Sequence, residues 1–298
     1  MKILLTGTAG QVGGALLPLL QGRADIVAPA LEEFDLSRPD ELAGKLDSIK
    51  PDLIVNPAAY TAVDRAEDER ELAFRINAES PRAIAKWAAP RGVPLVHFST
   101  DYVFDGSGDR PWREDSTPAP LSVYGQSKLA GDQAIAEAGA LHVIARTSWV
   151  YAATGANFLK TIVRLAGERE QLRIVGDQIG APTTADTISQ AVVAMLPRSG
   201  DDLRKAFEQR SGVVNLVCAG ETSWYGFATA IVAGLRSRGA KFAVKEIVPI
   251  RSDEFPVKAK RPSNSRLDLT RLRERFGITP PSWQQALDRE LDALKATI

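Results

Sequence analysis

The stretch that decides the fold stands at the start of the chain and reads Ile3-Leu4-Leu5-Thr6-Gly7-Thr8-Ala9-Gly10-Gln11-Val12-Gly13. Its apolar run predicts a buried strand, and the pattern from Gln11 to Leu20 predicts a helix interrupted by Pro18. Glycines at such a junction let the backbone turn tightly and let a pyrophosphate approach the helix N-terminus. The spacing G-x-x-G-x-x-G differs by one residue from the common dinucleotide fingerprint. A plain turn and helix cap is the alternative, but the place after the first strand favours a dinucleotide site.

Short apolar runs and helical patterns alternate through the first half of the chain. After Ile3–Leu5, strands are predicted at Ile26–Ala28, Asp52–Asn56, Pro94–Ser99 and His142–Ala145. Helical patterns cover Pro39–Ile49, Glu67–Ala89 and Tyr124–Ala138. This alternation predicts parallel βαβ units, so the fold class is α/β with a Rossmann-type, doubly wound parallel sheet.

The second half of the chain has a looser rhythm, with denser Gly, Pro and charge and shorter apolar runs. We therefore expect an NAD(P)-binding domain over residues 1–150, rejoined by the chain at about 178–200. Residues 151–298 are expected to form mainly a smaller, substrate-binding C-terminal lobe. In doubly wound sheets the ligand crevice lies beyond the carboxyl ends of the strands, so residues just after each apolar run are site candidates.

The composition excludes several classes of protein. Among 298 residues, 37 Lys and Arg balance 37 Asp and Glu, which is not the basic excess typical of nucleic-acid binding. A single cysteine, Cys218, excludes an internal disulfide framework, and the two histidines cannot complete a typical structural zinc site with it. The chain has no apolar stretch long enough to span a membrane and no signal-peptide pattern, so a soluble, cytoplasmic protein is expected.

A tyrosine and a lysine stand four residues apart in Tyr124-Gly125-Gln126-Ser127-Lys128. On a helix these two side chains share one face. A free tyrosine, with a pKa of about 10, is a poor acid–base catalyst at neutral pH, whereas a neighbouring ammonium lowers that pKa. The pair is therefore a candidate proton donor, although the same spacing also occurs by chance on helix surfaces.

A hydroxyl-bearing segment, Phe98-Ser99-Thr100-Asp101-Tyr102-Val103-Phe104-Asp105-Gly106, follows an apolar run. Thr100 is therefore expected at the crevice end of a strand, where its hydroxyl can hold a substrate carbonyl beside the tyrosine. The alternative is that Thr100 and Asp101 only cap a turn. Glycine loop, hydroxyl donor and Tyr/Lys pair occur in order, and together they are far more specific than any one of them.

These motifs resemble the extended short-chain dehydrogenase/reductase superfamily. The finer resemblance is to the dTDP-4-dehydrorhamnose reductase family, and it reaches from the first strand to about residue 270. The blocks that carry it are Asn56-Pro57-Ala58-Ala59-Tyr60-Thr61-Ala62-Val63-Asp64, Ser99–Gly106, Arg146-Thr147-Ser148-Trp149-Val150-Tyr151, Gly176-Asp177-Gln178-Ile179-Gly180-Ala181-Pro182-Thr183 and Arg261-Pro262-Ser263-Asn264-Ser265.

The resemblance implies an activity and a set of roles. Family members reduce the C4 ketone of dTDP-4-dehydro-L-rhamnose to dTDP-L-rhamnose with NADPH or NADH, in the biosynthesis of an activated sugar for cell-surface polysaccharide. It makes Tyr124 the general acid, has Lys128 bond the nicotinamide ribose, and has Thr100 bond the carbonyl or the tyrosine. Asp101, Tyr102 and Trp149 are the implied sugar-facing positions. The implied coenzyme positions, besides Tyr124 and Lys128, are Gly7, Gly10, Gln11, Val12, Gly13, Asp35, Leu36, Ala59, Tyr60 and Thr61.

A nucleotide diphosphate also needs cations, and a late cluster supplies Lys258, Lys260, Arg261 and Arg266. Arginine suits phosphate through its bidentate fork, so Arg261 is the candidate substrate ligand. A solvated charge run is the alternative, above all for the two lysines. Trp149 fits either a core position or packing on a sugar ring.

The sequence carries weaker signals for coenzyme preference and metal binding. The second strand ends Val27-Ala28-Pro29-Ala30-Leu31 and lacks both the acid that selects NAD and the arginine that suits NADP, with Glu32 and Glu33 coming later. Dual use or NADPH is favoured. Some relatives hold Mg²⁺ through glutamates at a dimer interface, but Asp186 has no convincing partners here, so no metal ligand is predicted. His97 fits a packed core histidine better than a catalyst.

Two other functions fit the same motifs. A reductase or epimerase of another nucleotide sugar uses the same Tyr/Lys machinery. Regulatory subunits of methionine adenosyltransferase share the fold but serve as binding partners. The intact Thr100, Tyr124 and Lys128 favour an enzyme with a nucleotide-sugar substrate, without nucleic-acid or membrane partners, as a monomer or homodimer.

Overall fold

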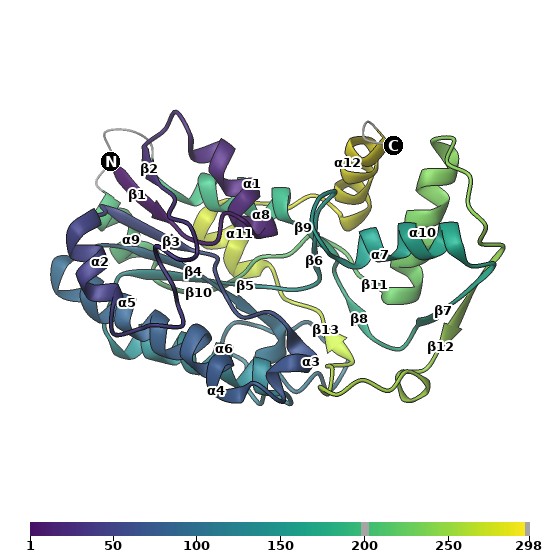
Figure 1. Ribbon diagram of the computed structural model, residues 1–298, viewed down its shortest axis with the longest axis horizontal. Helices are drawn as coiled ribbons and strands as arrows, with labels where there is room; N and C mark the ends of the chain where they lie inside the picture. Colours follow the sequence, from purple (N-terminus) through teal and green to yellow (C-terminus); the bar gives the residue numbers. More distant parts are fainter. Residues whose placement is uncertain (198–202, 296–298) are drawn as a thin grey trace.

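A parallel sheet forms the centre of the larger part of the molecule (Figure 1). The computed structural model describes residues 1–197 and 203–295. Within them the sheet runs in the order β10-β5-β4-β3-β1-β2, and every neighbouring pair is parallel. Its strands are β1 (Lys2–Leu5), β2 (Asp25–Val27), β3 (Leu53–Asn56), β4 (Leu95–Thr100), β5 (His142–Thr147) and β10 (Gly212–Asn215). The predicted doubly wound α/β fold is confirmed.

Helices cover both faces of this sheet because its strands are apolar on both faces. In β1, Ile3 and Leu5 pack with α1 (Gln11–Leu20) and α8 (Ala185–Met195), whereas Leu4 points to the opposite core. That opposite core lies beneath α2 (Leu42–Ile49), α5 (Ser80–Ala88) and α6 (Val123–Glu137). Helix α1 continues through Pro18, which removes one backbone donor, and ends at Leu20 as predicted.

The predicted long helical stretch Glu67–Ala89 is divided in the structure. After α3 (Val63–Ala66) come α4 (Arg70–Phe74), the π-helix η1 (Arg75–Glu79), α5 and the 3₁₀ turn η2 (Ala89–Arg91). The wide turn accompanies a close approach to α6, where a Cβ on Gly131 would lie 2.1 Å from the Asn77 carbonyl oxygen. Asn77 is buried there and donates to the Tyr60 carbonyl and to Ser127 Oγ. The π-helix thus arises from packing that a periodic pattern does not reveal.

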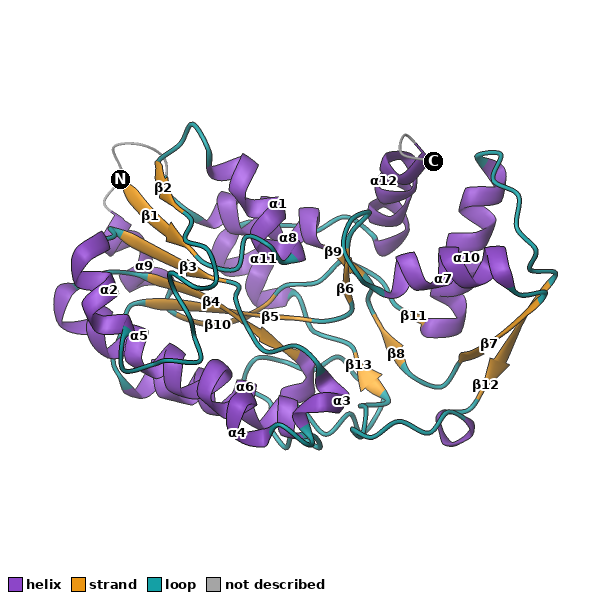
Figure 2. Ribbon diagram, viewed as in Figure 1, coloured by secondary structure: helices purple, strands orange, loops and turns teal. Residues whose placement is uncertain are grey.

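A smaller group of elements, which we call the small lobe, lies at the other end of the molecule (Figures 1 and 2). It consists of α7 (Phe158–Glu168), β7 (Gln171–Val175), α10 (Trp224–Ser237), β12 (Glu246–Ile250) and α12 (Trp283–Lys295). Strands β7 and β12 pair in parallel, and the helices share a separate apolar core around Tyr151, Phe227 and Leu291.

Short elements connect the two parts. β6 (Val150–Tyr151) pairs with β9 (Thr183–Thr184), and β8 (Ile179–Gly180) lies between β11 (Thr222–Ser223) and β13 (Asn264–Ser265). A 3₁₀ turn, η3 (Asp101–Val103), follows β4, and another, η4 (Ser252–Glu254), follows β12.

After residue 150 the chain also returns to the main sheet, through α8, α9 (Leu203–Arg210), β10 and α11 (Thr270–Phe276). The last residues of the two predicted ranges, 178–200 and 151–298, lie outside the residues that the structure describes. Among the described residues, no helix has the length and apolar character that crossing a membrane requires.

Candidate active site

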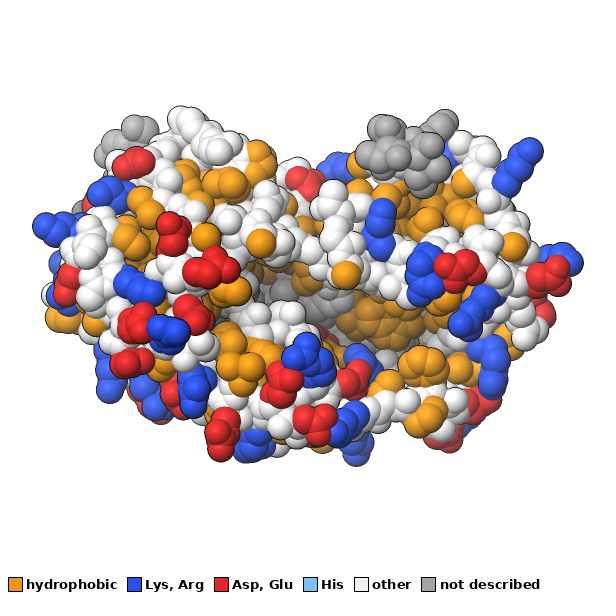
Figure 3. All heavy atoms as spheres, in the orientation of Figure 1, with side chains coloured by type: hydrophobic (Ala, Val, Ile, Leu, Met, Phe, Trp, Pro, Cys, Tyr) orange, Lys and Arg blue, Asp and Glu red, His pale blue; other side chains and the backbone are white. Residues whose placement is uncertain are grey.

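A cleft of about 820 Å³ lies between the sheet and the small lobe. The space-filling view shows the surface hollowed between the two parts, with hydrophobic side chains inside the hollow (Figure 3). Residues that follow β1, β4 and β5 line it, as the rule for carboxyl ends of parallel strands predicts. Trp224 and Arg261 reach the cleft from later parts of the chain.

The glycine loop forms one wall of the cleft, where all of residues 6–13 contribute. Gly7 has a φ of +60°, and a Cβ on Gly13 would lie 2.2 Å from the Gly7 carbonyl oxygen, so neither position accepts a side chain without movement. Gly10 caps α1 without any side-chain hydrogen bond. The first N–H groups of α1 are therefore left for a ligand, and this backbone cradle fits a pyrophosphate.

The predicted adenosine side is formed by Asp35, Leu36, Ala59 and Thr61, which all line the cleft. Tyr60 does not line it: its hydroxyl donates to Glu69 Oε2 at 2.6 Å, and its backbone N–H donates to Asn77 Oδ1. Burial tends to raise the pKa of Asp35, but hydrogen bonds from Ser37 outweigh it and lower that pKa.

The loop after β2 contributes mostly apolar residues to the same side. Pro29, Ala30 and Leu31 line the cleft, and Glu33 Oε2 accepts the Ala30 N–H at 2.8 Å. Arg38 lies near this side, 3.7 Å from Asp35 Oδ2, but is largely exposed and does not line the cleft. Neither an acid at the strand end nor a facing arginine therefore distinguishes NAD from NADP here.

Thr100, Tyr124 and Lys128 meet on the cleft floor. Thr100 is the last residue of β4, and Tyr124 and Lys128 lie one turn apart on α6, whose start is capped by Ser122 Oγ accepting from the Gly125 N–H at 3.2 Å. Burial raises the pKa of Tyr124, while a hydrogen bond with Thr100 acts to lower it. Tyr124 is therefore a phenol at neutral pH, which is the form that can donate a proton. The lowered pKa that the sequence predicts from the neighbouring Lys128 is not found, because burial is the largest effect on the phenol.

Lys128 is 2% exposed, and burial lowers its pKa to about 8. Its Nζ lies 3.1 Å from His97 Nε2. His97 was predicted to be a packed core histidine, and it is indeed buried, at 1% exposed. Its contact with Lys128 joins positions 31 residues apart and has no local signature in the sequence.

The predicted sugar-facing residues line the cleft beside this floor. Burial raises the pKa of Asp101 to about 6, and its Oδ2 has no hydrogen-bond partner among the described residues. Tyr102 packs edge-on against Tyr124, with ring centroids 5.5 Å apart. Trp149 has a φ of +49° and stacks on Trp224 at 3.6 Å, so an aromatic surface faces the cleft.

Sequence reasoning missed several lining residues. Thr147 Oγ1 and Ser148 Oγ are buried without partners in the described part of the chain, so both can bond a ligand. Their place directly after a predicted strand was a signal that could have found them. Trp224 carried no such signal, because only the fold brings it to Trp149.

The cationic residues that lie close together in the sequence do not form one cluster in the structure. Arg261 lines the cleft, where its guanidinium donates to Asp64 Oδ2 at 2.7 Å and to the Tyr102 hydroxyl at 3.2 Å. Lys258 pairs with Asp68, and Arg266 pairs with Glu221. Lys258, Lys260 and Arg266 do not line the cleft.

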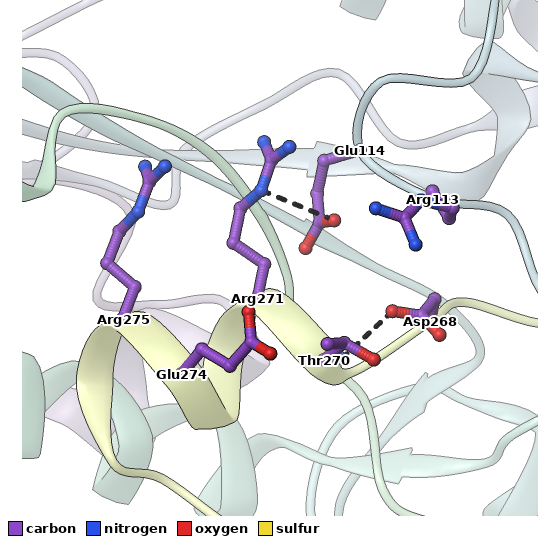
Figure 4. A pocket seen from close by; sticks show the side chains of 7 residues that line it. All are labelled: Arg113, Glu114, Asp268, Thr270, Arg271, Glu274 and Arg275. Atoms are coloured by element: carbon purple, nitrogen blue, oxygen red, sulfur yellow. Dashed lines mark hydrogen bonds and ion pairs between the residues drawn. The ribbon is translucent and has the colours of Figure 1, made fainter.

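A second cavity, of about 400 Å³, lies where α11 meets the segment around Arg113 (Figure 4). Its three arginines face three carboxylates, and Arg271 pairs with the buried Glu114 at 3.5 Å. The charges in this cavity balance, and no predicted site residue lines it. We therefore do not assign the catalytic reaction to this cavity.

No group of three or more metal-ligating side chains occurs within residues 1–197 and 203–295. Asp186, the acid considered for Mg²⁺, instead accepts a hydrogen bond from Gln190 on its own helix, at 2.7 Å.

Comparisons with known proteins show which proteins this chain resembles. The family model described as RmlD substrate binding domain matches residues 1–296. The chain is 46% identical to dTDP-4-dehydrorhamnose reductase of Burkholderia thailandensis over 289 residues, covering 96% of this chain and 97% of that one. It resembles the crystal structure of that reductase from Clostridium acetobutylicum, with a TM-score of 0.88, 34% identity and coverage of 99% and 100%. The Bacillus anthracis reductase, solved in complex with NADP, has a TM-score of 0.87, 33% identity and coverage of 98% and 99%.

Proposed function

Because the chain belongs to the RmlD substrate binding domain family, we propose that it is a dTDP-4-dehydrorhamnose reductase. It reduces the C4 ketone of dTDP-4-dehydro-L-rhamnose with NADPH or NADH and yields dTDP-L-rhamnose, in dTDP-rhamnose biosynthesis. The observation that carries this function is the meeting of Thr100, Tyr124 and Lys128 in the same cleft as the glycine loop.

The glycine loop fits the coenzyme, with Gly7, Gly10, Gln11, Val12 and Gly13 around the pyrophosphate. Asp35, Leu36, Ala59 and Thr61 fit the adenosine side, and Tyr60 supports that side through its backbone. When bound, NADPH or NADH supplies the hydride to the C4 carbon. All other steps fall to the side chains of this chain.

Tyr124 protonates the C4 oxygen as negative charge develops there. Tyr124 holds its proton at neutral pH, as a proton donor must, although burial in the free protein raises its pKa and so opposes proton release. Thr100 hydrogen-bonds the carbonyl oxygen and directs it toward Tyr124. Lys128 holds the nicotinamide ribose, and its charge stabilises the phenolate left after proton transfer.

The opposite side of the cleft binds the nucleotide sugar. Asp101 accepts from a sugar hydroxyl through its unpartnered Oδ2. Trp149 packs on the sugar ring, and Arg261, already oriented by Asp64 and Tyr102, bonds the diphosphate. We assign residues 1–150 mainly to coenzyme binding and 151–298 mainly to the substrate, with the stretch around 178–200 returning to the first part.

Three further expectations belong to this proposal. The enzyme works in the cytoplasm, as a monomer or homodimer, and needs no metal ligand from Asp186. A nucleotide sugar is its partner, and nucleic acids are not.

The test is the reverse reaction. Purified protein is mixed with NADP⁺ or NAD⁺ and dTDP-L-rhamnose, with dTDP-glucose and UDP-glucose in parallel, while the ketone is trapped chemically. We expect reduced nicotinamide to accumulate with dTDP-L-rhamnose. Turnover only with another sugar would indicate the alternative reductase or epimerase. If no reduced nicotinamide accumulates with any of the three sugar nucleotides although the coenzyme binds, the regulatory-subunit function would be favoured.

A further inference from the structure

A line of buried polar side chains runs beneath the cleft floor, away from the reacting groups. It starts at Lys128, whose Nζ lies 3.1 Å from His97 Nε2. His97 Nδ1 lies 3.3 Å from the Asn56 side-chain nitrogen, and Asn56 Oδ1 accepts from Thr6 Oγ1 at 2.6 Å. All four residues are at most 3% exposed. A polar group buried this deeply costs stability unless it is satisfied, so the order of donors and acceptors along the line is constrained.

Strand register explains why these residues meet. His97 and Asn56 are direct partners across β4 and β3, and Thr6 follows β1 on the far side of β3. Alternate residues of a strand share a face, so His97 and Ser99 both point toward α6. Ser99 donates to Asp132 Oδ2 at 2.7 Å, one helical turn after Lys128. The pairs His97–Lys128 and Ser99–Asp132 therefore stand side by side between β4 and α6.

The carboxylate nearest to Lys128 along α6 is that of Asp132, whose Oδ1 has no hydrogen-bond partner among the described residues and whose Oδ2 is engaged. Asp132 Oδ2 accepts from Ser99 and lies 3.6 Å from Arg146 Nε. Among the described residues, Lys128 forms no ion pair within 4.0 Å, and His97 is its hydrogen-bond partner. His97 Nε2 is thus the atom that hydrogen-bonds the Lys128 amine, and the tautomer of the imidazole decides which of the two donates.

We propose that His97 is a positioning residue for Lys128: its Nε2 accepts from the Lys128 ammonium and holds that group where it serves Tyr124 and the coenzyme ribose. This rests on the proposed function, which makes Lys128 part of the reduction. An ammonium can only donate, so Nε2 must carry a lone pair and Nδ1 the proton. For this state the Asn56 amide must be turned over from the observed orientation, in which its nitrogen faces His97 Nδ1 and its oxygen accepts from Thr6 Oγ1. The Nδ1–H then donates to the amide oxygen, and the amide nitrogen donates to Thr6 Oγ1.

The line has a second self-consistent state. When Lys128 is a neutral amine it can accept from Nε2–H, Nδ1 then accepts from the Asn56 amide nitrogen, and Thr6 Oγ1 donates to the amide oxygen. This is the amide orientation that the structure has. Both states fill the same space, because the amide and the imidazole each exchange a donor for an acceptor. The tautomer of His97 therefore follows the charge of Lys128.

Other titratable groups surround Lys128 and His97 on the elements packed against them. On α6 these are Asp132 and Tyr124, on β5 Arg146, and on η3 Asp101, while His142 acts on His97 from the start of β5. The contact from η1 is neutral, made by Asn77 to Ser127. Burial, and then the charge of Lys128, lowers the pKa of His97 well below its usual value, so His97 stays neutral while Lys128 titrates.

The first experiment needs no substrate and so separates this inference from the proposed function. Protein labelled with ¹⁵N-histidine gives signals from His97 and His142 alone, and His142→Gln assigns them. We expect neutral His97 with Nδ1–H at neutral pH, changing to Nε2–H as the pH rises past about 8, the pKa of Lys128. Nε2–H at neutral pH, or protonation of His97 in the ordinary histidine range, would overturn the proposal.

The second experiment compares His97→Gln, whose amide oxygen can replace the Nε2 acceptor, with His97→Leu, which removes it. We expect His97→Leu to lower kcat and to move the alkaline limb of its pH profile down by about one pH unit, because a hydrogen bond to the charged amine is lost. The His97→Gln variant should keep most of the wild-type kcat and an alkaline limb close to that of the wild type. Superimposable pH profiles of wild type and the folded leucine variant would contradict the proposal, since a merely structural role changes stability without moving the limb.

Discussion

The two walls of the cleft are built in different ways. The glycine-loop wall, residues 6–13, offers backbone N–H groups and tolerates no extra atoms, since a Cβ on Gly13 would lie 2.2 Å from the Gly7 carbonyl oxygen. The far wall, Trp149, Trp224 and Arg261, consists of side chains that other side chains orient. A change on the first wall therefore displaces backbone, whereas a change on the second removes one contact. The first should act sharply on coenzyme binding and the second gradually on substrate affinity.

Lys128, on the floor between the walls, should give the largest effect. Lys128→Met is expected to lower kcat by roughly 10²-fold or more, because charge stabilisation at the reacting oxygen is lost. The same change should stabilise the fold. The folded-state pKa of Lys128, about 8, lies below its ordinary 10.5, so the buried ammonium costs stability at every pH below about 8, and the cost fades as pH rises from 8 toward 10.5.

Parallel activity assays and denaturant titrations at several pH values check this prediction. At pH 7 the methionine variant should be more stable by about 1–3 kcal/mol, and the difference should shrink above pH 8. A variant that loses both activity and stability at neutral pH would show that the ammonium is a net stabilising group instead.

Gly13→Ala tests the glycine-loop wall. The added methyl group must push the loop aside, so we expect a loss of about 1–3 kcal/mol in stability and a large loss of coenzyme affinity. Gly44→Ala is the matched control: it lies inside α2 with nothing within 4 Å of its new Cβ, and should gain up to about 1 kcal/mol. Calorimetric coenzyme binding and thermal unfolding measure both. Normal coenzyme binding by the Gly13 variant would remove the loop from the coenzyme site.

Arg261→Gln tests the far wall. Removing the guanidinium should raise the KM for the sugar nucleotide roughly tenfold while the coenzyme Kd stays unchanged. Asp64→Asn, which weakens the partner of Arg261 at 2.7 Å, should act in the same direction but less strongly. Steady-state kinetics with either substrate varied would separate the two affinities. An equal loss of coenzyme affinity would mean that the walls are not independent.

The smallest effect is expected at Lys258, three residues before Arg261. Its ion pair with Asp68 is largely exposed, at 53% and 63%, and it does not line the cleft. Lys258→Ala should therefore change stability by less than about 0.5 kcal/mol and leave KM within about twofold. A KM increase as large as that of Arg261→Gln would place the lysine on the substrate.

The strands and helices of the main sheet were predictable because local hydrophobic patterns determine them. β3 and β5 begin and end close to the predicted runs, and α1 has the predicted bounds. The π-helix at 75–79 was not predictable, because it depends on the contact of Asn77 with α6. The return of β10 to the sheet edge likewise needed the fold.

The site divides in the same way. The glycine loop, Thr100, Tyr124 and Lys128 carry their chemistry in a contiguous stretch or a fixed spacing, so the sequence placed them as candidates. The Trp149–Trp224 stack and the two contacts of Arg261 join distant segments and have no local signature. His97 was recognisable as buried, but its contact with Lys128 depends on which helix covers β4.

The proposed role of Tyr124 as proton donor is tested with Tyr124→Phe and coenzyme already bound. Rapid mixing with dTDP-4-dehydro-L-rhamnose follows nicotinamide absorbance through one turnover, beside the wild-type protein. The assignment of Tyr124 as general acid predicts unchanged coenzyme binding and a rate lower by about 10²–10⁴-fold, because the proton for the C4 oxygen would then be missing. A phenylalanine variant that keeps most of the wild-type rate would contradict it.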